Sequence, residues 1–200
     1  MKYYKLTNQD MKTTNDTTWG ENVTHKAYGK GNELCSGDVI HVYDHPLKAA
    51  MFNPIHASID NPILWECRVR KVVANDQLKV GVKQCTTIKQ ISLPEITTNQ
   101  RIRFAIYCAL EVYNDKGFIK WANNWLSGKD RTWAAARAAA ENTAEVAWDA
   151  ARAAAWAARD AMRAAAWAAE AVRAAARAAE AARAEIINIT DLIKKAITYE

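Results

Sequence analysis

The sequence predicts an α+β fold, in which a small mixed N-terminal barrel-like sheet domain precedes an alanine-rich helical domain. Short segments that alternate apolar and polar residues fill residues 1–97, separated by turn residues, and this pattern is typical of strands. Alanine then dominates residues 133–184, and residues 132–200 contain neither glycine nor proline. Alanine has the highest helix propensity, so this segment is predicted to be helical. We therefore place the domains at residues 1–97 and 98–200.

In the first domain, strands are expected at residues 1–6, 39–43, 63–69, 78–82 and 87–91. The Thr/Asn/Asp/Gly-rich stretch from residue 7 to Gly31 has no sustained period and is predicted to be a loop. Asp44 or His45 would cap a short helix at residues 47–52, with Pro46 in its first turn.

In the second domain, apolar residues at helical spacing predict helices over residues 100–113 and 118–126. Asp130 is then expected to cap the alanine-rich segment. The pattern leaves open whether that segment forms one long helix or folds back into two or three antiparallel pieces. A restart at Asn142 or Thr143 would favour the second arrangement.

Composition narrows the classes of protein to consider. The 200 residues carry a formal net charge of +5, and basic residues form no block, so nucleic acid is a less favoured partner. No uncharged apolar run of about 18 residues is present, and the first five residues are not followed by an apolar segment. We therefore expect no membrane association and a cytoplasmic protein. Cys35, Cys67, Cys85 and Cys108 form no Cys-x-x-Cys pair and are expected to be reduced, mostly buried thiols.

Histidine is the residue most suited to chemistry in the first domain. His41 and His45 flank Asp44, but no further carboxylate or cysteine lies at ligand spacing, so we expect neither a metal nor another cofactor. His25 and His56 read as lone loop histidines. Gly29-Lys30-Gly31 alone does not define a phosphate loop, and no catalytic residue is assigned.

Arginine and tryptophan mark one face of the alanine-rich segment. Five of these residues form the predicted partner-binding stripe, namely Arg152, Trp156, Arg159, Arg163 and Trp167. The opposite face is almost pure alanine, which allows close packing against another helix, either within the chain or in a homo-oligomer. Tryptophans that fill an inter-helix core are the structural alternative.

Two stretches of sequence carry resemblances to known families. Glu33-Leu34-Cys35 precedes a strand that holds His41, and Asp44-His45-Pro46-Leu47 leads into a short helix. In these residues the first domain resembles a phage- and prophage-borne domain of unknown function. The order of its elements also resembles the small split barrel of rifampin-modifying ADP-ribosyltransferases. Of that family's site only His41 has a counterpart here, which favours a ligand-binding or purely structural barrel.

The second domain has Arg101-Ile-Arg103-Phe-Ala105-Ile-Tyr-Cys108-Ala109, then Trp121-Ala-Asn-Asn-Trp125 and long Ala/Arg runs. In these motifs it is similar to a family of bacterial immunity proteins. Together the resemblances imply a protein of a mobile element or conflict system.

The function predicted from these observations is that of a non-enzymatic, protein-binding inhibitor or immunity-type protein. Such a protein, for example a phage anti-defence or anti-CRISPR protein, would sterically occlude a host defence complex or a toxin. The alternative is a nucleotide-binding or ADP-ribosyltransferase-like domain, with His41 in a ligand pocket and the helices as an oligomerisation module.

The stripe is tested by Trp156→Ala and Arg163→Ala. If these side chains form a binding hot spot, each variant should weaken binding of a partner captured from host lysate by about 2 kcal/mol and leave the melting temperature nearly unchanged. A buried tryptophan would instead cost about 3–5 kcal/mol of folding stability. Thermal melts and affinities measured on the same two variants separate these outcomes. Lost stability with retained affinity would contradict the hot-spot prediction and indicate that the side chains pack in the core.

Overall fold

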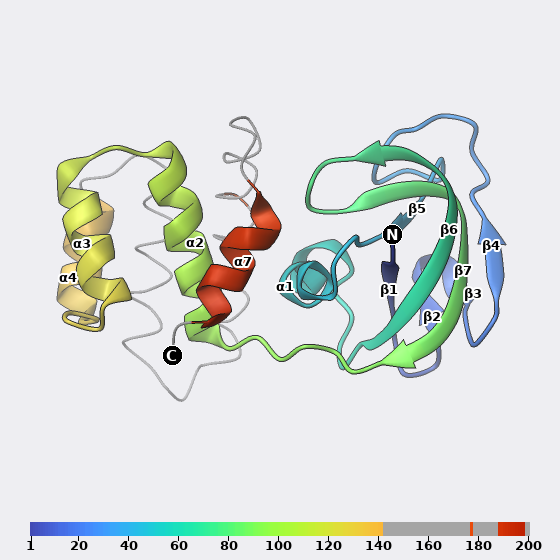
Figure 1. The fold of residues 1–200 in the computed structure, drawn as a ribbon, viewed down its shortest axis with the longest axis horizontal. Coiled ribbons are helices and arrows are strands. Elements are labelled where there is room, and N and C mark those ends of the chain that lie inside the picture. Colours follow the sequence, from blue (N-terminus) through green and yellow to red (C-terminus); the bar gives the residue numbers. More distant parts are fainter. Residues whose placement is uncertain (142–176, 178–187, 199–200) are drawn as a thin grey trace. The chain divides into compact units, whose positions relative to one another are not determined.

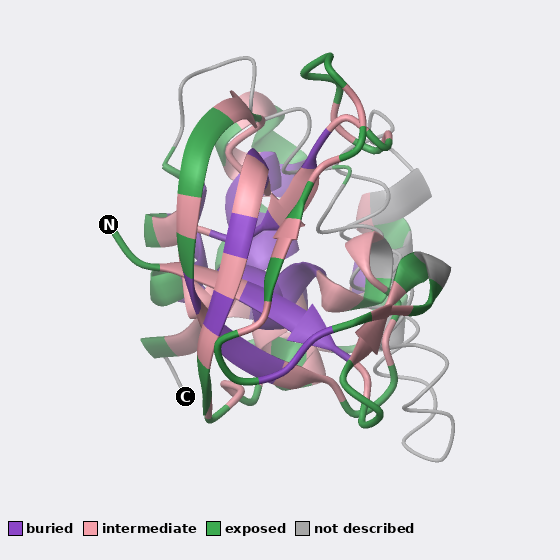
Figure 2. Ribbon diagram, turned by 90° about the vertical axis from the view of Figure 1, so that its right-hand side faces the viewer, coloured by how far each residue is buried: buried purple, intermediate pink, exposed green. Residues whose placement is uncertain are grey.

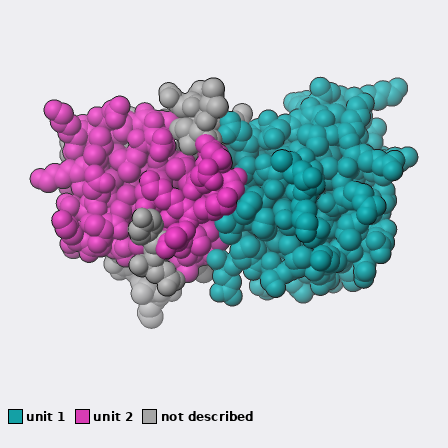
Figure 3. Space-filling view, in the orientation of Figure 1, with its two compact units in different colours: residues 1–95 teal, residues 96–200 magenta. Residues whose placement is uncertain are grey.

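The structure, a computed structural model, describes residues 1–141, 177 and 188–198 (Figure 1). The chain divides into unit 1, Met1–Glu95, and unit 2, Ile96–Glu200 (Figure 3). The predicted boundary between residues 97 and 98 lies close to this division. An antiparallel sheet in unit 1 followed by helices in unit 2 confirms the predicted α+β class.

Unit 1 is built on antiparallel strands that close on themselves. The sheet follows the order β1-β6-β7-β4, and β5 also pairs with β7. These strands are β1 (Tyr3–Thr7), β4 (Thr24–Lys26), β5 (Ile40–Val42), β6 (Ile63–Asn75) and β7 (Val80–Ile91). Immediately after β5, Tyr43 exchanges two backbone hydrogen bonds of 2.8 Å with Tyr4 of β1. The circuit β1-β6-β7-β5-β1 is therefore complete, which gives the unit its barrel-like form.

The strands differ from the predicted ones in two places. The stretch predicted as loop up to Gly31 contains β2 (Lys12–Thr13), a short 3₁₀ helix (Thr14–Asp16), β3 (Thr17–Thr18) and β4. That prediction was wrong because strands of two or three residues are too short to alternate. The segments predicted separately at 78–82 and 87–91 are one strand, β7, and β6 continues to Asn75. Register shifts at Glu66/Cys67 and Val72/Ala74 interrupt the alternation along β6.

The core of unit 1 joins the strands to one helix, α1 (Pro46–His56). The Nδ1 atom of His45 accepts a hydrogen bond from the Leu47 amide at 3.2 Å, which confirms the predicted cap, although the helix extends beyond residue 52. Phe52 in α1 is fully buried. Figure 2, in which the ribbon is coloured by burial, shows buried stretches along the strands of the sheet. A cluster between the strands comprises Trp19, Val42, Trp65, Cys67, Val80, Val82 and Cys85. This cluster buries inward positions of β5, β6 and β7, and α1 packs against β1.

Unit 2 begins with the two predicted helices, which are confirmed as α2 (Thr98–Val112) and α3 (Lys116–Leu126). Thr97 and Gln100 form a reciprocal capping box, with side chain to backbone distances of 3.2 and 2.9 Å, so α2 starts slightly earlier than expected. The other described helices are α4 (Trp133–Glu141) and α7 (Ile189–Thr198). Asp130 does not cap α4 directly. It accepts a hydrogen bond from the Thr132 amide at 3.0 Å, and the Thr132 hydroxyl accepts from Ala135 in the first turn at 3.3 Å.

Large side chains of α2, α3 and α7 make up the core of unit 2. Phe104 and Ile106 in α2 and Ile193 in α7 are completely buried, and α7 packs against α2. Trp121 and Trp125 in α3 are also buried. Both tryptophans therefore belong to the core of unit 2.

The packing of α1 predicts a large effect of truncating Phe52. Phe52→Ala should lower the free energy of unfolding by about 3–5 kcal/mol, because the change leaves a cavity in a fully buried site. Tyr28→Ala is the matched control, since the Tyr28 side chain is 93% exposed. Urea unfolding of the two variants measures the difference, and equal losses would contradict this account of the core.

Candidate ligand pocket

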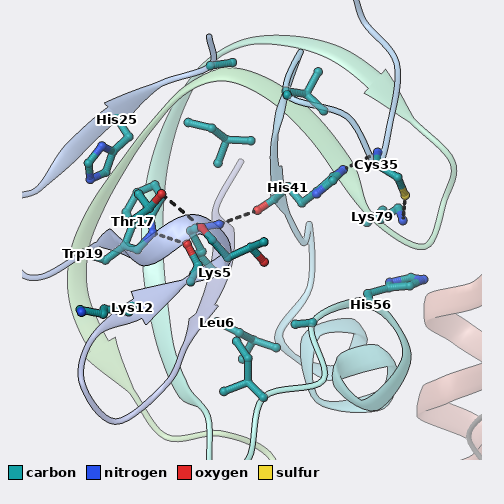
Figure 4. Close-up of a pocket in the computed structure, with 18 of the residues that line it drawn as sticks. Lys5, Leu6, Lys12, Thr17, Trp19, His25, Cys35, His41, His56 and Lys79 are labelled. Atoms are coloured by element: carbon teal, nitrogen blue, oxygen red, sulfur yellow. Dashed lines mark hydrogen bonds between the residues drawn. The ribbon is translucent and has the colours of Figure 1, made fainter. Parts of the chain in front are cut away.

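Unit 1 contains a cavity of about 850 Å³ whose lining comes from elements far apart in the sequence (Figure 4). β1 supplies Lys5, the β2–β3 region supplies Lys12 and Thr17, β4 supplies His25, and Lys79 precedes β7. Further lining residues are Tyr28, Cys35, Ser36, His41, Tyr43, His56 and Asp60. The closure of the barrel at Tyr4 and Tyr43 brings these segments together.

The inner wall of the cavity is formed by Lys5 and Trp19, both of which are buried. The Lys5 amine donates a hydrogen bond to the backbone oxygen of His41 at 3.2 Å, and it lies 4.7 Å from the centroid of the Trp19 ring. The Trp19 indole N–H donates to the Thr13 hydroxyl at 2.9 Å, which fixes the ring under the amine. Burial lowers the pKa of Lys5 below that of an exposed lysine.

Cys35, His41 and Lys79 form an outer cluster on another side of the cavity (Figure 4). The Nε2 atom of His41 accepts the backbone N–H of Cys35 at 2.9 Å, and the Lys79 amine lies 2.8 Å from the Cys35 sulfur. Cys35 has a left-handed backbone conformation, with φ of 64°, and the hydrogen bond from its N–H to His41 stabilises this conformation. Because Nε2 is an acceptor, the neutral ring carries its proton on Nδ1. Burial and the nearby Lys79 lower the pKa of His41 to about 4.

The sequence did not reveal that two further histidines line the same cavity. His56, the last residue of α1, stacks on Phe52 with ring centroids 5.5 Å apart, and burial lowers its pKa to about 4. His25 lies in β4, where its ring meets the edge of Trp19 at 4.6 Å. The prediction of two lone loop histidines was therefore wrong, because only the tertiary fold brings these positions to one site.

Lys83 organises the loop that carries part of the lining. Its amine donates to the backbone oxygens of Gly29 and Asp38 at 3.2 and 2.7 Å, and also to that of Gly31. A Cβ atom at Gly29 or Gly31 would collide with the carboxylate of Asp38. Gly29 therefore has a structural reason, because a Cβ there would also meet the backbone of Asp38, 2.8 Å away.

Lysine dominates the charge of the lining. Lys5, Lys12, Lys26 and Lys79 contribute amines, whereas Asp60 is the one carboxylate among the described lining residues. Lys12 is partly neutralised by Asp16, 3.4 Å away in an exposed ion pair. The remaining excess of amines makes the cavity suitable for an anion and unsuitable for a metal cation. In the part of the chain that the structure describes, no group of three or more His, Cys, Asp and Glu side chains could hold a metal ion.

The predicted site residues have different outcomes. His41 lines the cavity, as the ligand-pocket hypothesis requires. The five residues of the partner-binding stripe, Arg152, Trp156, Arg159, Arg163 and Trp167, lie outside the described residues, so that site stays a prediction. Cys67, Cys85 and Cys108 are buried and Cys35 is exposed, which confirms the expectation that the cysteines are mostly buried.

Comparisons with known proteins identify no relative. No family model, no curated protein and no solved structure matches the chain. Among the described helices, none has both the length and the apolar character needed to cross a bilayer.

The histidines of the cavity predict a specific dependence of stability on pH. The pKa values of His41 and His56 are lowered in the folded state to about 4, from 6.5, so the unfolded chain binds protons that the folded chain excludes. Their contribution to the free energy of unfolding is therefore complete above pH 6.5 and decreases as the pH falls towards 4.

Urea unfolding across this interval measures the effect. The double variant His41→Gln/His56→Gln should lose less stability than the parent over the same interval, because glutamine does not titrate and its oxygen retains an acceptor for the Cys35 N–H. The carboxylates are unchanged in this comparison, so parallel curves for the two proteins would contradict the prediction.

Proposed function

We propose that unit 1 binds an anionic ligand of the nucleotide type in this cavity. The observation that carries the proposal is the excess of lysine in the lining, with four amines against the single carboxylate of Asp60. An anion in a cavity with such a lining gains favourable interactions from several sides at once, and low-dielectric walls strengthen them.

The other lining groups support a ligand with a planar ring and hydroxyl groups. The volume of about 850 Å³ lies within the usual range for small-molecule sites. Thr13, Thr17 and Ser36 offer hydroxyls that both donate and accept hydrogen bonds. Tyr28 borders the cavity with its ring 93% exposed, so one face of the ring is available for stacking on a base.

Binding is favoured over group transfer. The ADP-ribosyltransferase resemblance implies a catalytic acid, and Asp60 is the one carboxylate among the described lining residues. Asp60 is exposed, four residues after the end of α1, and Asp76, whose charge acts on His41, lies outside the cavity lining. We therefore propose a ligand-binding barrel in which His41 positions the Cys35 loop.

The predicted role as a protein-binding inhibitor concerns other residues. It rests on the Arg/Trp stripe of residues 152–167 and on the resemblance to immunity proteins, and it stays a separate proposal. The two roles are compatible, because a ligand in unit 1 and a protein partner at the stripe would use different parts of the chain.

Calorimetry with ADP and adenosine tests the nucleotide proposal. ADP should bind more tightly than adenosine, and its affinity should decrease with added salt because the extra binding energy is ionic. Lys79→Gln and Lys26→Gln should each weaken ADP binding roughly fivefold, the effect of losing about 1 kcal/mol of charge-assisted hydrogen bonding. Their effect on adenosine should be small.

Lys89→Gln provides the matched control, since Lys89 is an exposed lysine of β7 outside the cavity lining. It should bind ADP as the parent does. Equal weakening by all three substitutions would show a nonspecific effect of net charge, and no binding of ADP at low salt would overturn the proposal.

A further inference from the structure

The amine of Lys5 is the feature of the cavity that anion binding alone leaves unexplained. A lysine side chain is seldom buried without an anionic partner, because its ammonium group loses hydration. Lys5 is 8% exposed, and among the described residues its amine has one hydrogen bond, to the backbone oxygen of His41. Its other close polar contact is the face of the Trp19 ring. The described neighbours of this amine therefore include no carboxylate.

The second buried lysine of unit 1 has a different environment. Lys48 in α1 is 4% exposed, and its amine lies 2.9 Å from one carboxylate oxygen of Asp44 and 3.1 Å from the other. Lys48 does not line the cavity. The same small unit thus buries one lysine as part of an ion pair and another, without such a pair, at the wall of a cavity.

The environment of Lys5 makes the neutral amine easier to form than it is at an exposed lysine. Burial lowers the pKa of Lys5, and the thiols of Cys85 and Cys67 oppose this effect only in part. A neutral amine has a free lone pair and is a nucleophile, whereas an ammonium group is not. Lys5 also sits where a ligand in the cavity would meet it, between Trp19 and the His41 backbone (Figure 4).

We propose that Lys5 forms a Schiff base with a phosphate-bearing aldehyde bound in the cavity. The amine nitrogen attacks the carbonyl carbon, the resulting carbinolamine loses water, and a C=N bond replaces the C=O bond. The departing water takes the carbonyl oxygen and both amine hydrogens, so the step needs no oxidant or further reactant. The inference rests on the proposed function in one respect: the phosphate is held by amines of the same lysine-rich lining that would hold the nucleotide anion.

Reductive trapping with pyridoxal 5′-phosphate tests the proposal. The intact protein is incubated with this anionic aldehyde at neutral pH, the imine is reduced with borohydride, and the modified lysines are located by peptide mass spectrometry. Lys5 should be modified at lower aldehyde concentration than the exposed Lys30 and Lys89, and the buried Lys48 should stay unmodified. Pyridoxal, which lacks the phosphate, should label Lys5 at least tenfold less efficiently.

Because the main readout uses the parent protein, the test does not depend on a variant that folds. Lys5→Arg, which keeps a cationic side chain but forms no imine under these conditions, should abolish the preferred site while Lys30 and Lys89 are labelled as before. Modification confined to exposed lysines, or equal labelling of Lys5 by pyridoxal, would overturn the proposal.

Competition with ADP separates this inference from the proposed function. Protection of Lys5 by ADP supports both. Preferred, phosphate-dependent labelling of Lys5 that ADP does not reduce supports the Schiff base and contradicts nucleotide binding. ADP binding without labelling of Lys5 supports nucleotide binding and contradicts the Schiff base.

Discussion

The backbone bridge between Tyr4 and Tyr43 is the interaction on which unit 1 depends most. It joins β1 to the end of β5, and so closes a sheet that would otherwise leave β1 as an open edge. Successive side chains on a strand point to opposite faces, so the same pairing sets the orientation of Lys5, the residue after Tyr4. Across the ladder Lys5 pairs with Trp65 of β6, and the Trp65 indole donates to the Thr7 hydroxyl at 3.0 Å. The Tyr4–Tyr43 bridge therefore both closes the barrel and sets the position of the Lys5 amine.

His41 connects the inner wall of the cavity to its outer cluster. Its backbone oxygen accepts the Lys5 hydrogen bond, while its ring accepts the Cys35 N–H. The β5 strand that holds His41 pairs with Gly81 of β7, and a Cβ there would press against Leu34 and Val39. A change in the pairing register of β5 would therefore shift His41, and with it Lys5 and Cys35, which His41 contacts, and Lys79, which contacts Cys35. This coupling gives His41 a structural role at both parts of the cavity.

Much of the fold could be predicted because its signals are local. The His45 and Thr97 caps, the Pro46 first turn and the spacing of apolar residues in α2 each depend on residues within one helical turn. The cavity could be predicted only at His41, and there from a resemblance. From the sequence, Lys5 is interpreted as a polar residue on the exposed face of a strand, because no residue near it in the sequence indicates that Trp19 packs against its amine. His25 and His56 lie far apart in the sequence, and their approach is a consequence of barrel closure, which leaves no periodic signal.

The charge of the cavity links its ligand chemistry to the stability of the unit. Protonation of His41 or His56 in acid adds positive charge to a lining that already holds four lysines, and both pKa values are lowered partly by Lys79. A bound anion acts in the opposite direction, because it offsets this repulsion in the folded state alone. A ligand present at about 100 times its Kd would stabilise the fold by about 2.7 kcal/mol. The lowered pKa values of Lys5, His41 and His56 therefore share one main cause, the burial of basic groups in a single lining that is rich in lysine.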